Sequence, residues 1–192
     1  MKKLQEKILT DGLALGTEVI KVDSFINHQI DTAFMMEMGQ EFYREFHSLH
    51  PTKILTIESS GIPAAVATAV CFGNIPVVFA KKAAPNTMVE EYYSAQVKSF
   101  TKGTVSTARV AKKYLSPQDK VLIIDDFLAH GEAASGLCEI LRQAKAEILG
   151  IGVIIEKCFQ HGRQKLAKYG CPVKALAMVE KIEDGHITFR EE

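Results

Sequence analysis

The chain has 192 residues, 47% of them apolar, and its 23 basic residues balance 23 acidic ones. This length and apolar content suit one domain of ordinary size with a substantial core. A formal net charge of zero argues against a general nucleic-acid binder, which needs a basic excess. No apolar run approaches the roughly 20 residues that cross a bilayer, and the start MKKLQEKILTDG lacks the apolar stretch of a signal peptide.

From residue 53 onward, short apolar runs alternate with segments of helical pattern. The expected strands are residues 53–59, 75–82, 121–125, 148–157 and 173–182, and the expected helices are residues 61–73, 134–145 and 161–170. Continuous apolar strands that alternate with helices are typical of a parallel sheet covered on both faces. The pattern therefore predicts an α/β fold with a mostly parallel twisted sheet flanked by helices.

Two segments interrupt this alternation. Residues 1–50 carry a helical pattern at each end, around the polar stretch IKVDSFINHQID. Residues 83–118 begin with the loop-like AAPNTM and contain two alternating runs around Thr101-Lys102-Gly103, which predicts a hairpin. Because a long polar excursion in an α/β domain is commonly an active-site lid, we expect residues 83–118 to form a flexible lid on a single domain of residues 1–192.

The cysteines give a further indication of compartment. Cys71, Cys138, Cys158 and Cys171 are scattered, with no CxxC pair. This spacing argues against a metal site or a disulfide framework and predicts free thiols in a cytoplasmic protein.

The stretch VLIIDDFLAHGEA has the layout of a phosphate site: a strand, a turn with glycine, then a helix. Ligands bind at the carboxyl ends of parallel strands, and we expect Asp125 and Asp126 to lie at such an end. The first turn of a helix has unpaired N–H groups and a positive dipole, so an anion there needs no lysine. The adjacent carboxylates suit ribose hydroxyls, or Mg²⁺ held through water.

This stretch resembles the phosphoribosyl diphosphate (PRPP) motif of type I phosphoribosyltransferases. It departs from the family pattern because Ala129, His130, Gly131, Glu132 and Ala133 replace the usual hydroxyl-rich loop, so backbone N–H groups must do more of the binding. The segments KVDSFINHQID, TIESSGI, PVVFAKK and IIEKCFQHGR extend the resemblance over nearly the whole chain, to purine-salvage members that act on xanthine. The implied fold is the type I phosphoribosyltransferase fold, with residues 1–50 as a base-binding hood.

The resemblance implies roles for residues around PRPP. Asp125 and Asp126 are the catalytic acids at the ribose, and the loop 129–133 holds the 5′-phosphate. The diphosphate is implied to contact Ser59, Ser60, Lys81 and Lys82, with Tyr92, Tyr93 and Ser94 of the lid closing over it. His130 is expected to be an exposed loop residue and not a catalytic base.

Recognition of the base is expected from other residues. A lysine such as Lys157 only donates hydrogen bonds, which suits a 6-oxo purine and excludes adenine. The Asn27 amide can donate to a 2-oxo group, and the resemblance adds Ile20 to these xanthine contacts. Phe159 either stacks on the base or packs in the core, and Arg163 either reaches phosphate or caps the sheet.

The implied reaction is transfer of the phosphoribosyl group from PRPP to xanthine, giving xanthosine 5′-monophosphate (XMP) and diphosphate. The resemblance further implies Mg²⁺ bound mainly through PRPP and not by protein groups alone, and a homodimer without nucleic-acid or membrane partners. Two alternatives remain. One is a guanine or hypoxanthine phosphoribosyltransferase. The other is a non-catalytic PRPP-sensing regulator, although the chain has no spare length for a DNA-binding domain.

Overall fold

The computed structural model describes residues 1–82, 91–99 and 103–190. A six-stranded sheet with the order β10-β9-β8-β7-β3-β4 forms its centre. The strands are β3 (Lys53–Ile57), β4 (Val77–Ala80), β7 (Lys120–Leu128), β8 (Glu147–Lys157), β9 (Val173–Glu183) and β10 (His186–Phe189). Strands β4, β3, β7, β8 and β9 pair in parallel, and β10 runs antiparallel to β9. The predicted mostly parallel sheet is confirmed.

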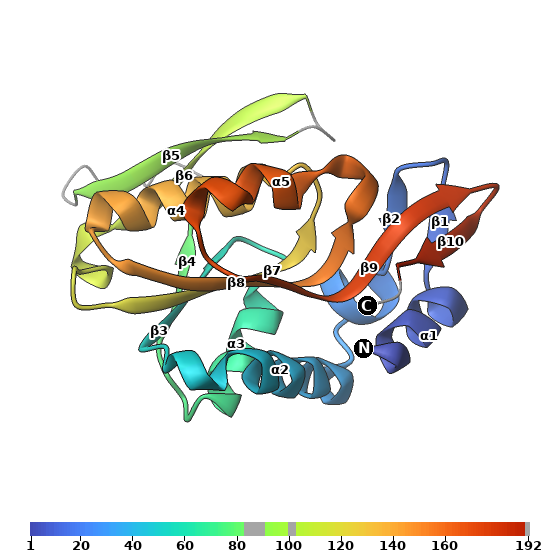
Figure 1. Cartoon of the computed structure of the whole chain (residues 1–192), viewed down its shortest axis with the longest axis horizontal. Helices are drawn as coiled ribbons and strands as arrows, with labels where there is room; N and C mark the ends of the chain where they lie inside the picture. Colours follow the sequence, from blue (N-terminus) through green and yellow to red (C-terminus); the bar gives the residue numbers. More distant parts are fainter. Residues whose placement is uncertain (83–90, 100–102, 191–192) are drawn as a thin grey trace.

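Helices cover both faces of this sheet (Figure 1). Helices α2 (Thr32–Phe46) and α3 (Ile62–Cys71) lie on one face, whereas α4 (Glu132–Ala144) and α5 (Gly162–Leu166) lie on the other. Helix α1 (Lys2–Asp11) packs against β9. Short helical turns are η1 (Asp23–Asn27), η2 (His47–Leu49), η3 (Lys112–Tyr114), η4 (Cys158–Gln160) and η5 (Ala167–Tyr169). Two buried clusters, one on each side of the sheet, make up the core.

The sequence of α2 explains how it docks on the sheet. The Asp31 side chain caps the helix by accepting from the Phe34 backbone N–H at 3.1 Å, and buried residues then recur every three or four positions. Phe42 and Phe46 from this buried stripe rest on β8 where the strand carries Gly152 and Gly150. A Cβ at either glycine would come within 2.9 Å of a phenylalanine ring, so these glycines let the helix lie close to the sheet.

Two antiparallel hairpins flank the main sheet. The first, β1 (Leu13–Leu15) with β2 (Val19–Lys21), was not predicted. The second, β5 (Tyr92–Ser99) with β6 (Thr104–Ala111), confirms the predicted hairpin. It lies over α4, where Val97 packs against Gly136 and the Gln143 amide exchanges two hydrogen bonds with the Ser94 backbone, at 2.8 and 3.2 Å. The expected AAPNTM loop, with Thr101 and Lys102 of the turn, lies outside the described residues.

One strand end differs from the prediction. Strand β7 does not stop at Asp125 but continues to Leu128, so both acids lie within the strand. Residues Asp125, Phe127 and Leu128 keep parallel partners on β8, which extends just as far. The phosphate-site turn therefore begins four residues after the first acid.

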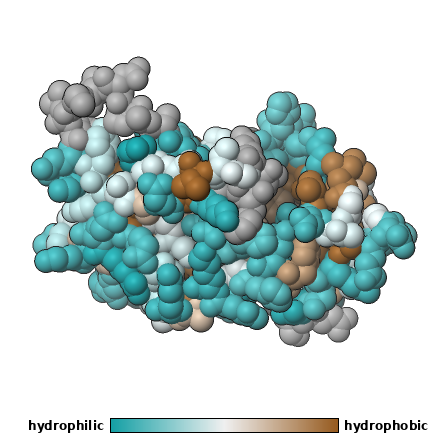
Figure 2. All heavy atoms as spheres, turned by 90° about the horizontal axis from the view of Figure 1, so that it is seen from above, coloured by the Kyte–Doolittle hydropathy of each residue, from teal (hydrophilic) through white to brown (hydrophobic). Residues whose placement is uncertain are grey.

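Figure 2 shows a mostly hydrophilic face, with apolar atoms gathered over the region where Figure 1 places β1 and β2. The exposed apolar side chains of these strands are Leu13, Leu15 and Val19. Among the described residues, every helix is too short or too polar to span a bilayer.

Candidate active site

A cavity of about 640 Å³ lies where β7 and β8 end. Parts of the chain that are far apart in sequence meet around it: the turn between β1 and β2, the β5–β6 hairpin, the loop after β7, and the end of β8. Its lining comprises Glu18, Val19, Lys82, Val97, Lys98, Thr104, Ser106, Phe127, Leu128, the residues 129–134, Lys157 and Gln160. The structure thus brings all five residues of the predicted 5′-phosphate loop into one cavity with Lys82 and Lys157.

The loop 129–133 has the backbone geometry of an anion site. Gly131 has φ of 76° and starts α4 without a side-chain cap. Within the described part of the chain, no hydrogen bond uses the backbone N–H groups of residues 131–134, which line the cavity. Free N–H groups at the positive end of a 13-residue helix attract an anion. Glu132, which sits among them, has its charge offset by Lys165, whose Nζ lies 2.5 Å from Oε1.

Asp125 and Asp126 are both nearly buried, at 4% and 8% exposed. Their carboxylates accept backbone N–H groups: Asp125 Oδ1 from Asp126 at 2.9 Å, and Asp126 Oδ1 from Phe127 at 3.0 Å. Burial, followed by the charge of Asp126, raises the pKa of Asp125 well above its usual range, while the charge of Lys82 opposes this shift. Burying two neighbouring carboxylates costs energy, and a ligand with hydroxyl donors is suited to offset it.

Gly61, in the loop after the neighbouring strand β3, leaves no room for a side chain next to Asp125. A Cβ at Gly61 would lie 2.5 Å from Asp125 Oδ1 and still closer to Thr56 Oγ1. Thr56 is fully buried, and its hydroxyl has no partner among the described residues. The loop after β3 therefore packs directly on the first acid of the PRPP-like motif.

Of the predicted diphosphate residues, Ser59 and Ser60 lie in that loop, and Lys81 and Lys82 follow the neighbouring strand β4. Ser59 is exposed and Ser60 half-buried in the turn before α3, and the Glu58–Ser59 peptide bond is cis. The Lys82 backbone N–H donates to the Glu58 carboxylate, which joins the two strand ends. Lys81 is exposed and exchanges backbone hydrogen bonds of 2.9 Å with Arg109 of the hairpin.

The predicted base-recognition residues Asn27 and Lys157 both lie near Asp126, although only Lys157 is part of the cavity lining. Asn27 Nδ2 lies 3.4 Å from Asp126 Oδ2. Lys157 Nζ donates to Glu18 O at 2.7 Å and lies 5.5 Å from the centre of the Phe127 ring. Burial lowers the pKa of Lys157, and the charges of Glu18 and Asp126 partly counter this.

Other predicted residues lie away from this cavity. Ile20 is buried in the core on β2, beside the cavity residue Val19. Phe159 packs partly on the core and lines a second cavity of about 300 Å³, together with Arg163. Tyr92, Tyr93 and Ser94 are the first three residues of β5. They pair with residues 109–111 at the base of the hairpin.

Several cavity residues were missed by the sequence analysis. Phe127 directly follows the acid pair, and a longer strand would have directed attention to it. Lys98 and Ser106 come from opposite strands of the hairpin and reach the cavity only because the hairpin lies on α4. Gln160 also lines the cavity, and its buried Oε1 has no partner among the described residues.

Comparison with known proteins agrees with this geometry. Residues 27–189 match the family model described as "Phosphoribosyl transferase domain". The chain therefore belongs to the phosphoribosyltransferase family, whose type I fold it has.

Relatives define the branch of the family. A xanthine phosphoribosyltransferase of Streptococcus gordonii is 53% identical over 189 residues, covering 98% of this chain and 97% of the relative. Another, from Streptococcus pneumoniae, is 52% identical over 191 residues, covering 100% and 98%.

Solved structures share the fold. An adenine phosphoribosyltransferase of Rhodothermus marinus has a TM-score of 0.72 at 19% identity, covering 93% of this chain and all of that one. That of Thermoanaerobacter pseudethanolicus has a TM-score of 0.68 at 19% identity, covering 77% and 82%.

Proposed function

We propose that this chain transfers the phosphoribosyl group of PRPP to xanthine, giving XMP and diphosphate. The observation that carries the proposal is a pair of hydrogen-bond donors near the second acid: Asn27 Nδ2 lies 3.4 Å from Asp126 Oδ2, and Lys157 lines the cavity beside the Phe127 ring. The full-length similarity to xanthine phosphoribosyltransferases supports the same base.

The two donors account for the choice of base. Lys157 offers hydrogen bonds to a 6-oxo group, and Asn27 Nδ2 offers one to a 2-oxo group, the feature that distinguishes xanthine from hypoxanthine. The Phe127 ring, at the cavity wall beside Lys157, would stack on the base. Ile20 supports this end from the core, and Phe159 from behind the end of β8.

In the proposed reaction the protein positions the ribosyl group and stabilises its charge. The loop 129–133 binds the 5′-phosphate through backbone N–H groups, and Asp125 and Asp126 accept from the ribose hydroxyls. Positive charge that builds on the ribosyl ring in the transition state lies beside the two carboxylates. Ser59, Ser60, Lys81 and Lys82 contact the leaving diphosphate.

The donor set bears on how Mg²⁺ is held. Among the described residues, no three His, Cys, Asp or Glu side chains are grouped to hold a cation. We therefore propose that Mg²⁺ is carried mainly by PRPP, where it offsets the negative charge of the leaving diphosphate.

The β5–β6 hairpin is proposed as the lid, with Tyr92, Tyr93 and Ser94 at its base. Its residues Lys98 and Ser106 already reach the cavity that holds the phosphate loop. A covered cavity excludes water that would hydrolyse PRPP.

We further propose a cytoplasmic location, which fits the free cysteines of the described chain. We also propose a homodimer, since α3 and β4 expose Val66, Val70 and Phe79. Light scattering on the purified protein measures the mass, and a monomer at micromolar concentration would contradict the dimer.

The test is a turnover assay with PRPP and Mg²⁺ in which xanthine, guanine, hypoxanthine, adenine and uracil are offered separately. We expect the highest kcat/KM with xanthine. Lys157→Ala should lower kcat/KM about 10- to 100-fold, the value of a charged hydrogen bond. Asn27→Ala should lower the preference for xanthine over hypoxanthine about fivefold to tenfold, because a neutral hydrogen bond is lost.

Lys174→Ala is the matched control, since Lys174 pairs with Glu45 on the surface far from the cavity. Faster turnover with guanine or hypoxanthine would refute the role given to Asn27. Binding of PRPP without nucleotide formation from any base would refute the transferase and favour the sensing regulator.

A further inference from the structure

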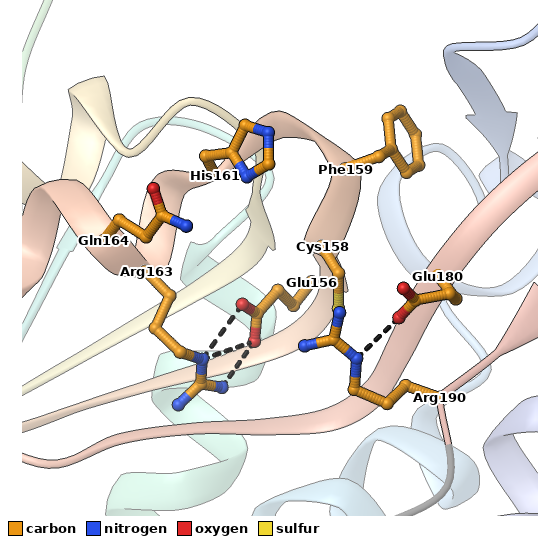
Figure 3. Close-up of a pocket in the computed structure, with 8 residues that line it drawn as sticks. All are labelled: Glu156, Cys158, Phe159, His161, Arg163, Gln164, Glu180 and Arg190. Carbon is orange, nitrogen blue, oxygen red and sulfur yellow. Dashed lines mark hydrogen bonds and ion pairs between the residues drawn. The ribbon is translucent and has the colours of Figure 1, made fainter.

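The second cavity is lined by an ion pair that joins three elements, with its carboxylate buried and its guanidinium partly exposed (Figure 3). Glu156 of β8 is 3% exposed, and its carboxylate faces the Arg163 guanidinium of α5. Arg163 Nε lies 3.0 and 3.1 Å from the two Glu156 oxygens, and Nη2 donates to Oε2. Arg163 Nη1 also donates to Val173 O of β9 at 2.5 Å. Because the guanidinium is planar, such a pair fixes direction as well as distance.

One end of the pair adjoins the base side of the active site. Glu156 directly precedes Lys157 on β8, and successive side chains of a strand point to opposite faces. Fixing the Glu156 side chain on one face of β8 therefore fixes the direction in which the Lys157 side chain leaves the other face, toward Glu18 and the cavity.

The other end adjoins the phosphate side. Arg163 directly follows Gly162, and a Cβ on Gly162 would lie 2.9 Å from both Gly131 N and Leu128 Cδ1. It would lie closer still to Ala129 O. Helix α5 thus begins in direct contact with the backbone of the phosphate loop.

A strand pairing closes the ring between the two ends. Leu128, the last residue of β7 before the phosphate loop, is the register partner of Glu156. Gly162 is bonded to Arg163, Arg163 pairs with Glu156, and Glu156 lies opposite Leu128 in the sheet. These contacts form a closed ring. Residues 158–160, which connect Lys157 to the start of α5, contribute Gln160 to the wall of the active-site cavity.

From this ring we infer that the Glu156–Arg163 pair is a positioning device that sets the distance between the base-binding Lys157 and the 5′-phosphate loop. The inference rests on the proposed function, because the ligand that spans both ends is a purine nucleotide. XMP must satisfy both ends at once, whereas ribose 5-phosphate engages the phosphate end alone. An error in the spacing therefore weakens XMP and spares ribose 5-phosphate.

The test is the Arg163→Lys variant, which keeps a positive charge beside buried Glu156 but loses the planar fork. By calorimetry we expect the Kd of XMP to rise about tenfold, a modest misplacement effect, and that of ribose 5-phosphate to change less than about twofold. In turnover, KM for xanthine should rise by a similar factor, with kcat changed less. Arg190→Lys is the matched control, since Arg190 lines the same cavity but pairs with Glu180 on β9.

A double variant separates positioning from folding. Glu156→Met with Arg163→Met removes both charges, so no unpaired carboxylate stays buried, and methionine keeps a similar side-chain length at the half-buried position 163. We expect a near wild-type melting temperature together with the same selective loss of XMP affinity. Equal weakening of XMP and ribose 5-phosphate, or unchanged XMP affinity in Arg163→Lys, would overturn the inference. If the proposed function is wrong, the wild-type protein will not form XMP from xanthine. The affinities of the variants are then compared for the nucleotide that the wild type forms best and for ribose 5-phosphate.

Discussion

Replacing Gly61 by alanine tests how tightly the active site is packed. Gly61 has φ of −73° and ψ of −19°, so alanine fits its backbone and any effect must come from the added methyl group. That methyl would lie 2.5 Å from Asp125 Oδ1 and closer to Thr56 Oγ1, and both neighbours are buried. Overpacking of this kind costs about 1–3 kcal/mol, which lowers the melting temperature of a protein of this size by roughly 2–12 °C.

Gly61→Ala should also impair catalysis, because the added methyl group displaces the Asp125 carboxylate. Displacement of a catalytic group by less than an ångström lowers kcat/KM about 10- to 100-fold. Calorimetric melting and the xanthine turnover assay measure the two effects. Wild-type melting and wild-type turnover in Gly61→Ala would refute the contact between Gly61 and Asp125.

A compensating change identifies the clash. Thr56→Ala removes the hydroxyl that has no partner among the described residues, and it makes room for the new methyl group. Adding Thr56→Ala to Gly61→Ala should therefore recover part of the stability, while turnover stays low because the crowding of Asp125 persists. Additive losses in the double variant would show that Thr56 is not the obstructing neighbour.

Three further outcomes are expected. Asp125→Asn should raise the melting temperature. Because the pKa of Asp125 is higher in the folded than in the unfolded protein, ionisation of this carboxyl destabilises the fold once the pH rises above about 4, the pKa in the unfolded chain. The gain in melting temperature should therefore grow with pH and then level off. A gain that shrinks between pH 4 and 9 would contradict this. Gln143→Ala removes both hydrogen bonds to Ser94 and should speed proteolysis within the β5–β6 hairpin, while an unchanged cleavage rate would argue against that anchor. Burial raises the pKa of the Cys138 thiol to about 12, so it should react with a thiol reagent only after unfolding.

Periodicity and composition predicted the parallel strands of the main sheet because they form continuous apolar runs, which in β7 and β8 are almost wholly buried. The β7 end was wrong, since a pair of acids usually marks the end of a buried strand. Here the carboxylates accept backbone N–H groups beside them, and Phe127 and Leu128 continue the pairing with β8. The missed strands β1, β2 and β10 are three or four residues long and mostly exposed, so they lack the apolar run that revealed the equally short β4.

The candidate site likewise has a part that the sequence predicted and a part that only the structure shows. Its phosphate loop and acids are contiguous in sequence, so the motif predicted which residues would lie together. Whether Arg163 reaches phosphate or caps the sheet depended on distances that sequence does not contain, and its guanidinium pairs with Glu156. The contact of Gly61 with Asp125 was equally hidden, because the space a glycine leaves is visible only once the strands are assembled.

The proposed base-binding end of the site joins residues that are very far apart along the chain. Asn27 meets Asp126 across 99 positions, and Lys157 meets Glu18 across 139. During synthesis, an amino-terminal hairpin must therefore wait until most of the polypeptide has left the ribosome before it gains its partner. A nascent or prematurely terminated chain that lacks β8 cannot form these contacts, so such fragments should lack the proposed base-binding end.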